Sequence, residues 1–139
     1  MKRLHVHLHV DDIGNSVRFY TTLFAAEPAV LRADYAKWQL EDPRVNFAIS
    51  TGASGPGLDH LGIEVESADE LAAIAARGDA AGFDAFVEPD ARCCYARSTK
   101  RWFTDPQAIK WETFHTVARI DTYGEDRTGP ASGAPLCCP

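Results

Sequence analysis

The chain has 139 residues, which is enough for one domain with one core and too few for two ordinary domains. Hydrophobic residues make up 45% of it and charged residues 24%, as in a globular soluble protein. Its formal net charge of -6 and its lack of a Lys/Arg block argue against nucleic acid and anionic membranes as partners. No apolar run approaches the roughly 18 residues that a membrane-spanning helix requires, and the amino-terminal segment does not resemble a signal peptide, so we expect a cytoplasmic location.

The first predicted element is a strand over residues 4–10. Apolar residues at the even positions alternate with His5, His7 and His9. Alternation with a period of two is typical of a strand that packs one of its faces. Three imidazoles on the opposite face favour a metal site over a purely structural role.

A helix is predicted next, over residues 12–26, where apolar side chains recur at helical spacing. We expect Asn15 or Ser16 to cap its amino-terminal end. Two strand-like runs follow, over residues 35–43 and 44–51, and an Asp-Pro turn joins them. The segment "TGASGPG" then reads as a linker, because it is rich in residues that form turns.

The second half of the chain repeats this order. An offset of 55 residues aligns "HVHLHVDD" from His5 with "HLGIEVES" from His60. A helix is predicted over residues 67–83, where a Ser-x-x-Glu capping box opens the segment. Strand-like runs over residues 99–106 and 108–116 follow, again joined by an Asp-Pro turn.

The repeat predicts an α+β fold built from two β-α-β-β-β modules, over about residues 1–52 and 57–118. We expect residues 1–118 to form a single domain and residues 119–139, rich in Gly and Pro, to form a flexible tail that contains cysteines. The second copy is longer than the first near residues 93–94, so we interpret that stretch as an inserted loop.

Two pairs of adjacent cysteines stand out, Cys93-Cys94 and Cys137-Cys138. Neighbouring residues bond to each other only through a strained ring, since disulfides favour Cα atoms about 5.5 Å apart. In a reducing compartment such pairs are ligands or nucleophiles more often than structural bridges. The alternative is that they are small buried hydrophobic residues. The polar segments on either side of the first pair favour an exposed loop.

The matched histidines predict a metal centre. If the two first strands lie near a pseudo-two-fold axis, His5 and His60 face each other, and Glu112 in "KWETF" adds a carboxylate. Two imidazoles and one carboxylate form a facial triad that suits Fe(II) oxygenase chemistry. His7 is the competing ligand, about 6.6 Å from His5 along the strand. Its repeat partner is Gly62, which indicates open space at that level. His9 and His115 are interpreted as residues that do not bind the metal.

Over residues 1–118 the chain resembles the vicinal oxygen chelate superfamily, which includes glyoxalase I, the fosfomycin and bleomycin resistance proteins and the extradiol dioxygenases. The motifs "MKRLHVHLHVDD", "DHLGIEV", "CCYA", "TDP" and "WETF" resemble its C–As lyase and cadmium-induced branch. The resemblance implies a cupped mixed sheet with the metal ligands on its concave side. It also implies a homodimer.

What this branch implies is an Fe(II)-dependent dioxygenase that cleaves the carbon–arsenic bond of trivalent organoarsenicals, such as methylarsenite or aromatic arsenicals, and releases arsenite. The implied metal ligands, which are also the catalytic residues, are His5, His60 and Glu112. Cys93 and Cys94 are the implied arsenic-binding thiols. The sequence leaves open which metal a purified sample contains, because nickel, cobalt or zinc can replace the easily oxidised iron. The sequence "RSTK" departs from the branch pattern and leaves the role of the lysine at position 100 open.

The chemistry of arsenic agrees with this implication, because a soft element prefers thiolates to nitrogen or oxygen donors. Two alternatives remain. One is a non-catalytic protein that sequesters cadmium or arsenic through its thiols. The other is a glyoxalase-type or fosfomycin-resistance-type metalloenzyme. The second lacks support because Ala48 or Ile49 stands where a fourth ligand would repeat Glu112.

Overall fold

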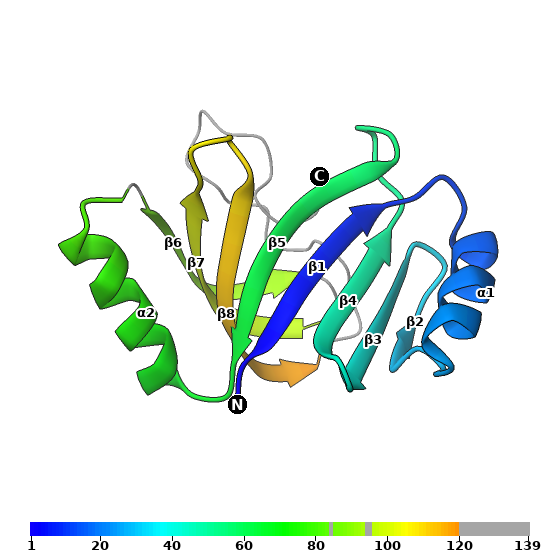
Figure 1. The fold of residues 1–139 in the computed structure, drawn as a ribbon, viewed down its shortest axis with the longest axis horizontal. Helices are drawn as coiled ribbons and strands as arrows, with labels where there is room; N and C mark the ends of the chain where they lie inside the picture. The colour runs from blue at the N-terminus through cyan, green and yellow to red at the C-terminus, as the bar shows by residue number, and fades with distance from the viewer. Residues whose placement is uncertain (84, 94–95, 120–139) are drawn as a thin grey trace.

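The computed structural model describes residues 1–83, 85–93 and 96–119. Eight strands form one mixed sheet in the order β2-β3-β4-β1-β5-β8-β7-β6, and the helices α1 and α2 lie at opposite ends of it (Figure 1). The strands are β1 (Arg3–His9), β2 (Val30–Leu31), β3 (Tyr35–Glu41), β4 (Arg44–Ser50), β5 (Gly57–Val65), β6 (Ala85–Cys93), β7 (Ala96–Thr104) and β8 (Lys110–Arg119). The helices are α1 (Ile13–Phe24) and α2 (Ala68–Ala80). The α+β class and the two β-α-β-β-β modules are confirmed.

The core of the first module lies between α1 and one face of the sheet. Ile13 from α1 packs with buried Trp38, Phe47 and Ile49, and the apolar residues of β1 contact the same cluster. Burial of this many large apolar groups supplies most of the free energy that holds a short helix on a sheet. The predicted cap is wrong, because Asp12 caps α1 and its side chain accepts a hydrogen bond from the backbone N–H of residue 15.

The second module repeats this arrangement with a smaller core. Its buried cluster consists of Val65, Leu71 and Ile74, with partly buried Phe103 against it. The predicted helix start is confirmed, since the Ser67 side chain accepts a hydrogen bond from the third residue of α2. A cavity of about 530 Å³ remains between α2 and the sheet.

The described residues on either side of the predicted inserted loop, up to Cys93 and from Ala96 onward, belong to the sheet. β6 and β7 each contain nine residues and pair antiparallel, with Ala85 opposite Phe103 and Cys93 opposite Ala96. In the first module the corresponding strand β2 has only two residues. The additional length of the second module therefore lengthens two paired strands, because pairing between strands overrides the polar composition of this segment.

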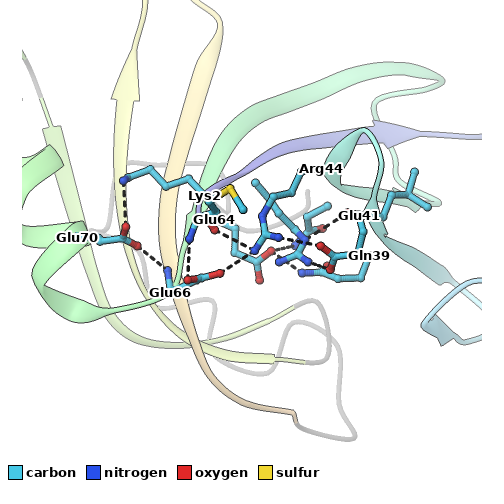
Figure 2. A network of polar contacts seen from close by, with 11 residues as sticks. Lys2, Gln39, Glu41, Arg44, Glu64, Glu66 and Glu70 are labelled. Carbon is cyan, nitrogen blue, oxygen red and sulfur yellow. Dashed lines mark hydrogen bonds and ion pairs between the residues drawn. The ribbon is translucent and has the colours of Figure 1, made fainter.

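The modules join where β1 pairs antiparallel with β5. A network of polar side chains also connects the two modules near this junction, and Figure 2 shows these side chains. Arg44 of β4 contacts Glu41 at 2.8 Å and Glu66, which follows β5, at 2.7 Å. Lys2 extends the network to Glu70 of α2 at 3.1 Å. The amino-terminal segment thus links the first module to the helix of the second.

None of the helices in the described residues is both long enough and apolar enough to span a membrane.

Candidate metal centre

The predicted metal ligands lie on the face of the sheet opposite the α1 core, which we call the site face. Along β1, Val6 and Leu8 contact the apolar core, and the three histidines turn to the site face, where His5, His7 and His9 are 5%, 0% and 4% exposed. β5 contributes His60 to this face, and β8 contributes Glu112. The alternation of strand side chains therefore accounts for the placement of all three β1 imidazoles.

One chain brings His5, His60 and Glu112 together. The two Nε2 atoms of the histidines are 3.1 Å apart. Glu112 Oε2 is 3.0 Å from His60 Nε2 and 3.4 Å from His5 Nε2. All three side chains are buried. Three donor atoms from three strands thus lie within 3.4 Å of one another.

Each of the two imidazoles is oriented through its other nitrogen. His5 Nδ1–H donates to the backbone carbonyl of Asn46 at 3.0 Å. The side-chain amide of Asn46 is itself held in place, because its Nδ2 donates to Glu64 Oε2 at 3.1 Å. His60 Nδ1–H donates to Asp59 Oδ2 at 2.5 Å. Both histidines therefore direct Nε2 toward the point of convergence.

The two imidazoles differ in electrostatic environment. Burial lowers the pKa of His5 to about 4, although the Glu112 carboxylate opposes this shift. Burial also lowers the pKa of His60, but its hydrogen bonds to Asp59 and Glu112 outweigh that effect and raise the pKa to about 9. His60 is thus protonated at neutral pH in the metal-free protein, and its Nε2–H donates to the Glu112 carboxylate.

Glu112 carries a negative charge in this buried setting. Burial favours its neutral form, but the Lys100 ammonium and the His60 imidazole hold the pKa of this carboxyl well below its usual range. Lys100 is itself buried and forms an ion pair with Glu112 Oε1. Glu112 therefore has one oxygen on the lysine and one oxygen facing the histidines.

His7 is the third imidazole of the cluster. One ligand atom from each of His5, His7 and His60 lies within 4.8 Å of the others. His7 Nε2 is 2.8 Å from the hydroxyl of Ser50. Burial, followed by the nearby His60, keeps the pKa of His7 well below its ordinary value, so this side chain is neutral at pH 7.

The strand registers explain why Glu112 and His7 occupy different positions. Gly62 of β5 lies opposite Glu112, and a Cβ at Gly62 would lie 2.3 Å from the Glu112 backbone oxygen. His7, the repeat partner of Gly62, lies opposite Ala48 of β4. The first module thus has the large residue, His7, on its first strand and the small one, Ala48, on its last. In the second module the small residue, Gly62, is on the first strand and the large one, Glu112, is on the last. Ala48, which is the counterpart of Glu112, offers no ligand atom.

The donor set fits a divalent cation. The buried histidine group is consistent with divalent metal binding, and two imidazole nitrogens with a carboxylate oxygen are ligands used by iron, zinc and manganese. In the metal-free protein, a proton on His60 Nε2 joins this imidazole to Glu112. A metal ion takes the place of such a proton when imidazole binds it.

The cysteine predictions fall largely outside the described residues. Cys94, Cys137 and Cys138 lie outside them, and Cys93 is the last residue of β6. The hairpin of β6 and β7 places this end of β6 beside Ala96. The role of Cys93 and Cys94 in binding arsenic stays a prediction.

Sequence reasoning missed three partners of the predicted residues. Asn46, Asp59 and Ser50 contact histidines of the cluster. Asn46 and Ser50 lie on β4 at alternate positions beside β1, a relation visible only once the register is known. Alternation along β5 would place Asp59 on the opposite face from His60, so no pattern in the sequence indicated it.

With this fold and this site described, comparison with known proteins identifies the class. Residues 2–113 match the Glyoxalase/Bleomycin resistance protein/Dioxygenase superfamily. The chain belongs to this superfamily, as its resemblance to the vicinal oxygen chelate proteins implied.

Individual proteins of this superfamily are similar to the chain over most of its length. The "Trivalent organoarsenical cleaving enzyme" of Bacillus sp. (strain MD1) is 38% identical over 144 residues, which is 99% of this chain and 83% of that protein. The "Cadmium-induced protein CadI" of Mycobacterium tuberculosis (strain ATCC 25618 / H37Rv) is 34% identical over 145 residues, which is 99% of this chain and 93% of that one. The fold matches the Mn(II)-bound glyoxalase of Novosphingobium aromaticivorans with a TM-score of 0.62 at 19% identity, over 89% of this chain and 44% of that one.

Proposed function

We propose that the protein is an Fe(II)-dependent dioxygenase that cleaves the carbon–arsenic bond of trivalent organoarsenicals and releases inorganic arsenite. The observation that carries this proposal is the convergence of His5, His60 and Glu112, whose donor atoms lie within 3.4 Å of one another. The proposal is further supported by a relative of 38% identity named as a trivalent organoarsenical cleaving enzyme.

In this proposal His5 Nε2, His60 Nε2 and Glu112 Oε2 hold the iron. An iron(II) ion with open coordination positions supplies the activation of dioxygen. The chain supplies the setting for it. Burial of the three donors limits access of water, and Lys100 neutralises the second carboxylate oxygen so that Glu112 presents one oxygen. A cavity of about 30 Å³ adjoins His5, Lys100 and Glu112.

Cys93 and Cys94 are proposed to bind the arsenic atom. Monomethyl arsenic(III) has two exchangeable positions and one carbon, so two thiolates saturate it and leave the carbon–arsenic bond exposed. Thiolates are the preferred donors for so soft an element. Fixing the substrate in this way lowers the entropic part of a reaction barrier, by about 7–11 kcal/mol in the best-oriented cases.

The direct test compares arsenite release with and without oxygen. Reduced, Fe(II)-loaded protein is incubated with methylarsenite under air and under nitrogen, and arsenite is measured by separation of the arsenic species. We expect release only under air, and loss of release in Glu112→Gln and in Cys94→Ser. Equal yields under the two atmospheres would contradict dioxygenase chemistry.

A second candidate function is thiol-based sequestration without catalysis, which the 34% identical cadmium-induced relative favours. In that function Glu112 has no part. Arsenic or cadmium would then bind equally well to the wild type and to Glu112→Gln, and no substrate would be consumed by either protein. The variant Cys94→Ser would be the one that loses binding.

A further inference from the structure

Asp59 occupies an irregular position in β5. His7 pairs with His60, but the next residue of β1, Leu8, pairs with Leu58, so Asp59 has no partner across the ladder. An extra residue of this kind is a β-bulge, and bulges near active sites redirect a side chain. Here the bulge turns Asp59 to the site face, although a regular strand would direct it to the opposite face from His60.

The redirected carboxylate contacts two imidazoles. Asp59 Oδ2 accepts from His60 Nδ1–H at 2.5 Å, and Asp59 Oδ1 lies 3.0 Å from His9 Nε2. The side chain of Asp59 is only 13% exposed. An ionised carboxylate accepts hydrogen bonds and donates none.

A series of side-chain contacts leads from Asp59 to His7. Asp59 Oδ1 lies 3.0 Å from His9 Nε2, and His9 Nδ1 lies 3.3 Å from the Ser50 hydroxyl. That hydroxyl lies 2.8 Å from His7 Nε2. His7 Nε2 therefore faces Ser50, whereas His60 Nε2 faces Glu112.

We propose that Asp59 is a positioning residue that selects which imidazole nitrogens are available to the metal. Through one oxygen it holds the proton of His60 on Nδ1 and leaves Nε2 for coordination. Through the other it holds His9, which contacts the Ser50 hydroxyl that faces His7 Nε2. The inference deepens the proposed metal site and depends on that site for its effect on affinity. Carboxylates that orient metal-binding histidines typically change metal affinity about 10–100-fold when replaced.

The test uses zinc, which is diamagnetic, and two measurements. Zinc affinity is measured by competition with a chromophoric chelator. The ring nitrogens and ring protons of His60 are followed by NMR in the metal-free and zinc-loaded protein. For the wild type we expect a downfield Nδ1–H signal in both states and zinc on Nε2. The amide oxygen of Asp59→Asn is a weaker acceptor than a carboxylate, so for this variant we expect that signal to move upfield and zinc to bind about 10–100-fold more weakly.

Two variants serve as controls. Asp69→Asn removes one acidic group from the first turn of α2 and should leave both measurements unchanged. Asp59→Glu retains a group that only accepts, so it should recover the Nδ1–H signal and much of the affinity, which keeps the inference testable if Asp59→Asn does not fold.

The outcomes separate the two proposals. Wild-type affinity and an unchanged His60 Nδ1–H signal in Asp59→Asn would overturn the inference alone. A wild-type protein that binds no zinc at this site would overturn the metal centre, and the Nδ1–H signal of the metal-free protein would still decide whether Asp59 fixes the proton of His60.

Discussion

Among single residues, Glu112 and His7 show how neighbours divide the roles within the cluster. Glu112 has space beside it because the facing residue is Gly62, and His7 has space because the facing residue is Ala48. Glu112 Oε2 faces two imidazole nitrogens, whereas His7 Nε2 is held by Ser50. Burial alone does not distinguish the two side chains, since both are almost fully buried. Their hydrogen-bond partners do.

Replacing these two residues should therefore have unequal effects on metal binding. Glu112→Gln removes a charged donor, so we expect zinc affinity to fall by more than the ~10–100-fold typical of a partner that only orients a ligand. His7→Asn should weaken binding by about tenfold at most. Competition titration against a chelator measures both. Equal losses in the two variants would mean that His7 is a ligand.

The same residues set the pH dependence of the metal-free protein. The folded-state pKa of His5 is about 4 and that of His7 lies well below 6.5, so the unfolded chain binds more protons as the pH falls below about 6.5. The folded-state pKa of His60 is about 9, so the folded protein binds more protons between pH 6.5 and 9. The unfolding free energy should therefore be greatest near pH 6.5 and fall on both sides.

Urea titrations of EDTA-treated protein at acidic, near-neutral and alkaline pH measure this profile. We expect a slope of at most about 1.4 kcal/mol per pH unit from each group. In His60→Gln the decline toward pH 9 should disappear, whereas the acidic decline should persist because His5 and His7 remain. A wild-type stability that rises steadily to pH 9 would contradict the raised pKa of His60.

At the scale of elements, two strands approach each other closely beside the site. β5 and β8 are parallel, and Gly62 faces the backbone of Glu112 so closely that a Cβ would lie 2.3 Å from its carbonyl oxygen. Backbone cannot yield as a flexible side chain does. Any side chain at this position must therefore separate the two strands that carry His60 and Glu112.

Gly62→Ala should lower the unfolding free energy by about 1–3 kcal/mol, as overpacking does in well-packed interiors. It should also weaken zinc binding, because the donors of β5 and β8 move apart. Gly14→Ala is the matched control. Its Cβ would meet only Asp12 at 3.4 Å within α1, and alanine favours a helix over glycine by about 0.5–1 kcal/mol. Urea unfolding that is unchanged in Gly62→Ala would contradict the close approach.

Elements with a clear period were predictable, and irregular ones were not. Alternation identified β1 and β5, and helical spacing identified α1 and α2. The segment before Cys93 read as a loop because its residues are polar, yet pairing with β7 makes it a strand. Hydrogen bonds between strands far apart in sequence override local composition there. The bulge at Asp59 left no signal, because a bulge depends on the partner strand.

In the whole molecule, duplication explains both the site and its asymmetry. An offset of 55 residues relates His5 to His60, and the antiparallel pairing of β1 with β5 brings the two copies together. The relation of His5 to His60 followed from the repeat, whereas Glu112 was chosen as a carboxylate on the last predicted strand. Ala48 occupies the position that corresponds to Glu112 and offers no ligand atom. Only the second module therefore contributes a carboxylate to the site. Asn46, Asp59 and Lys100 could not be predicted, since each acts through a tertiary contact with no spacing of its own.

The central claim is that one divalent ion is shared by the two halves of this duplicated fold. A crystal structure of the protein loaded anaerobically with iron(II) tests it most directly. We expect one ion bound by His5 Nε2, His60 Nε2 and Glu112 Oε2, at about 2.0–2.2 Å as for other divalent ions with such ligands. An ion bound instead by His7, or by cysteine thiolates alone while Glu112 stays paired with Lys100, would contradict the claim.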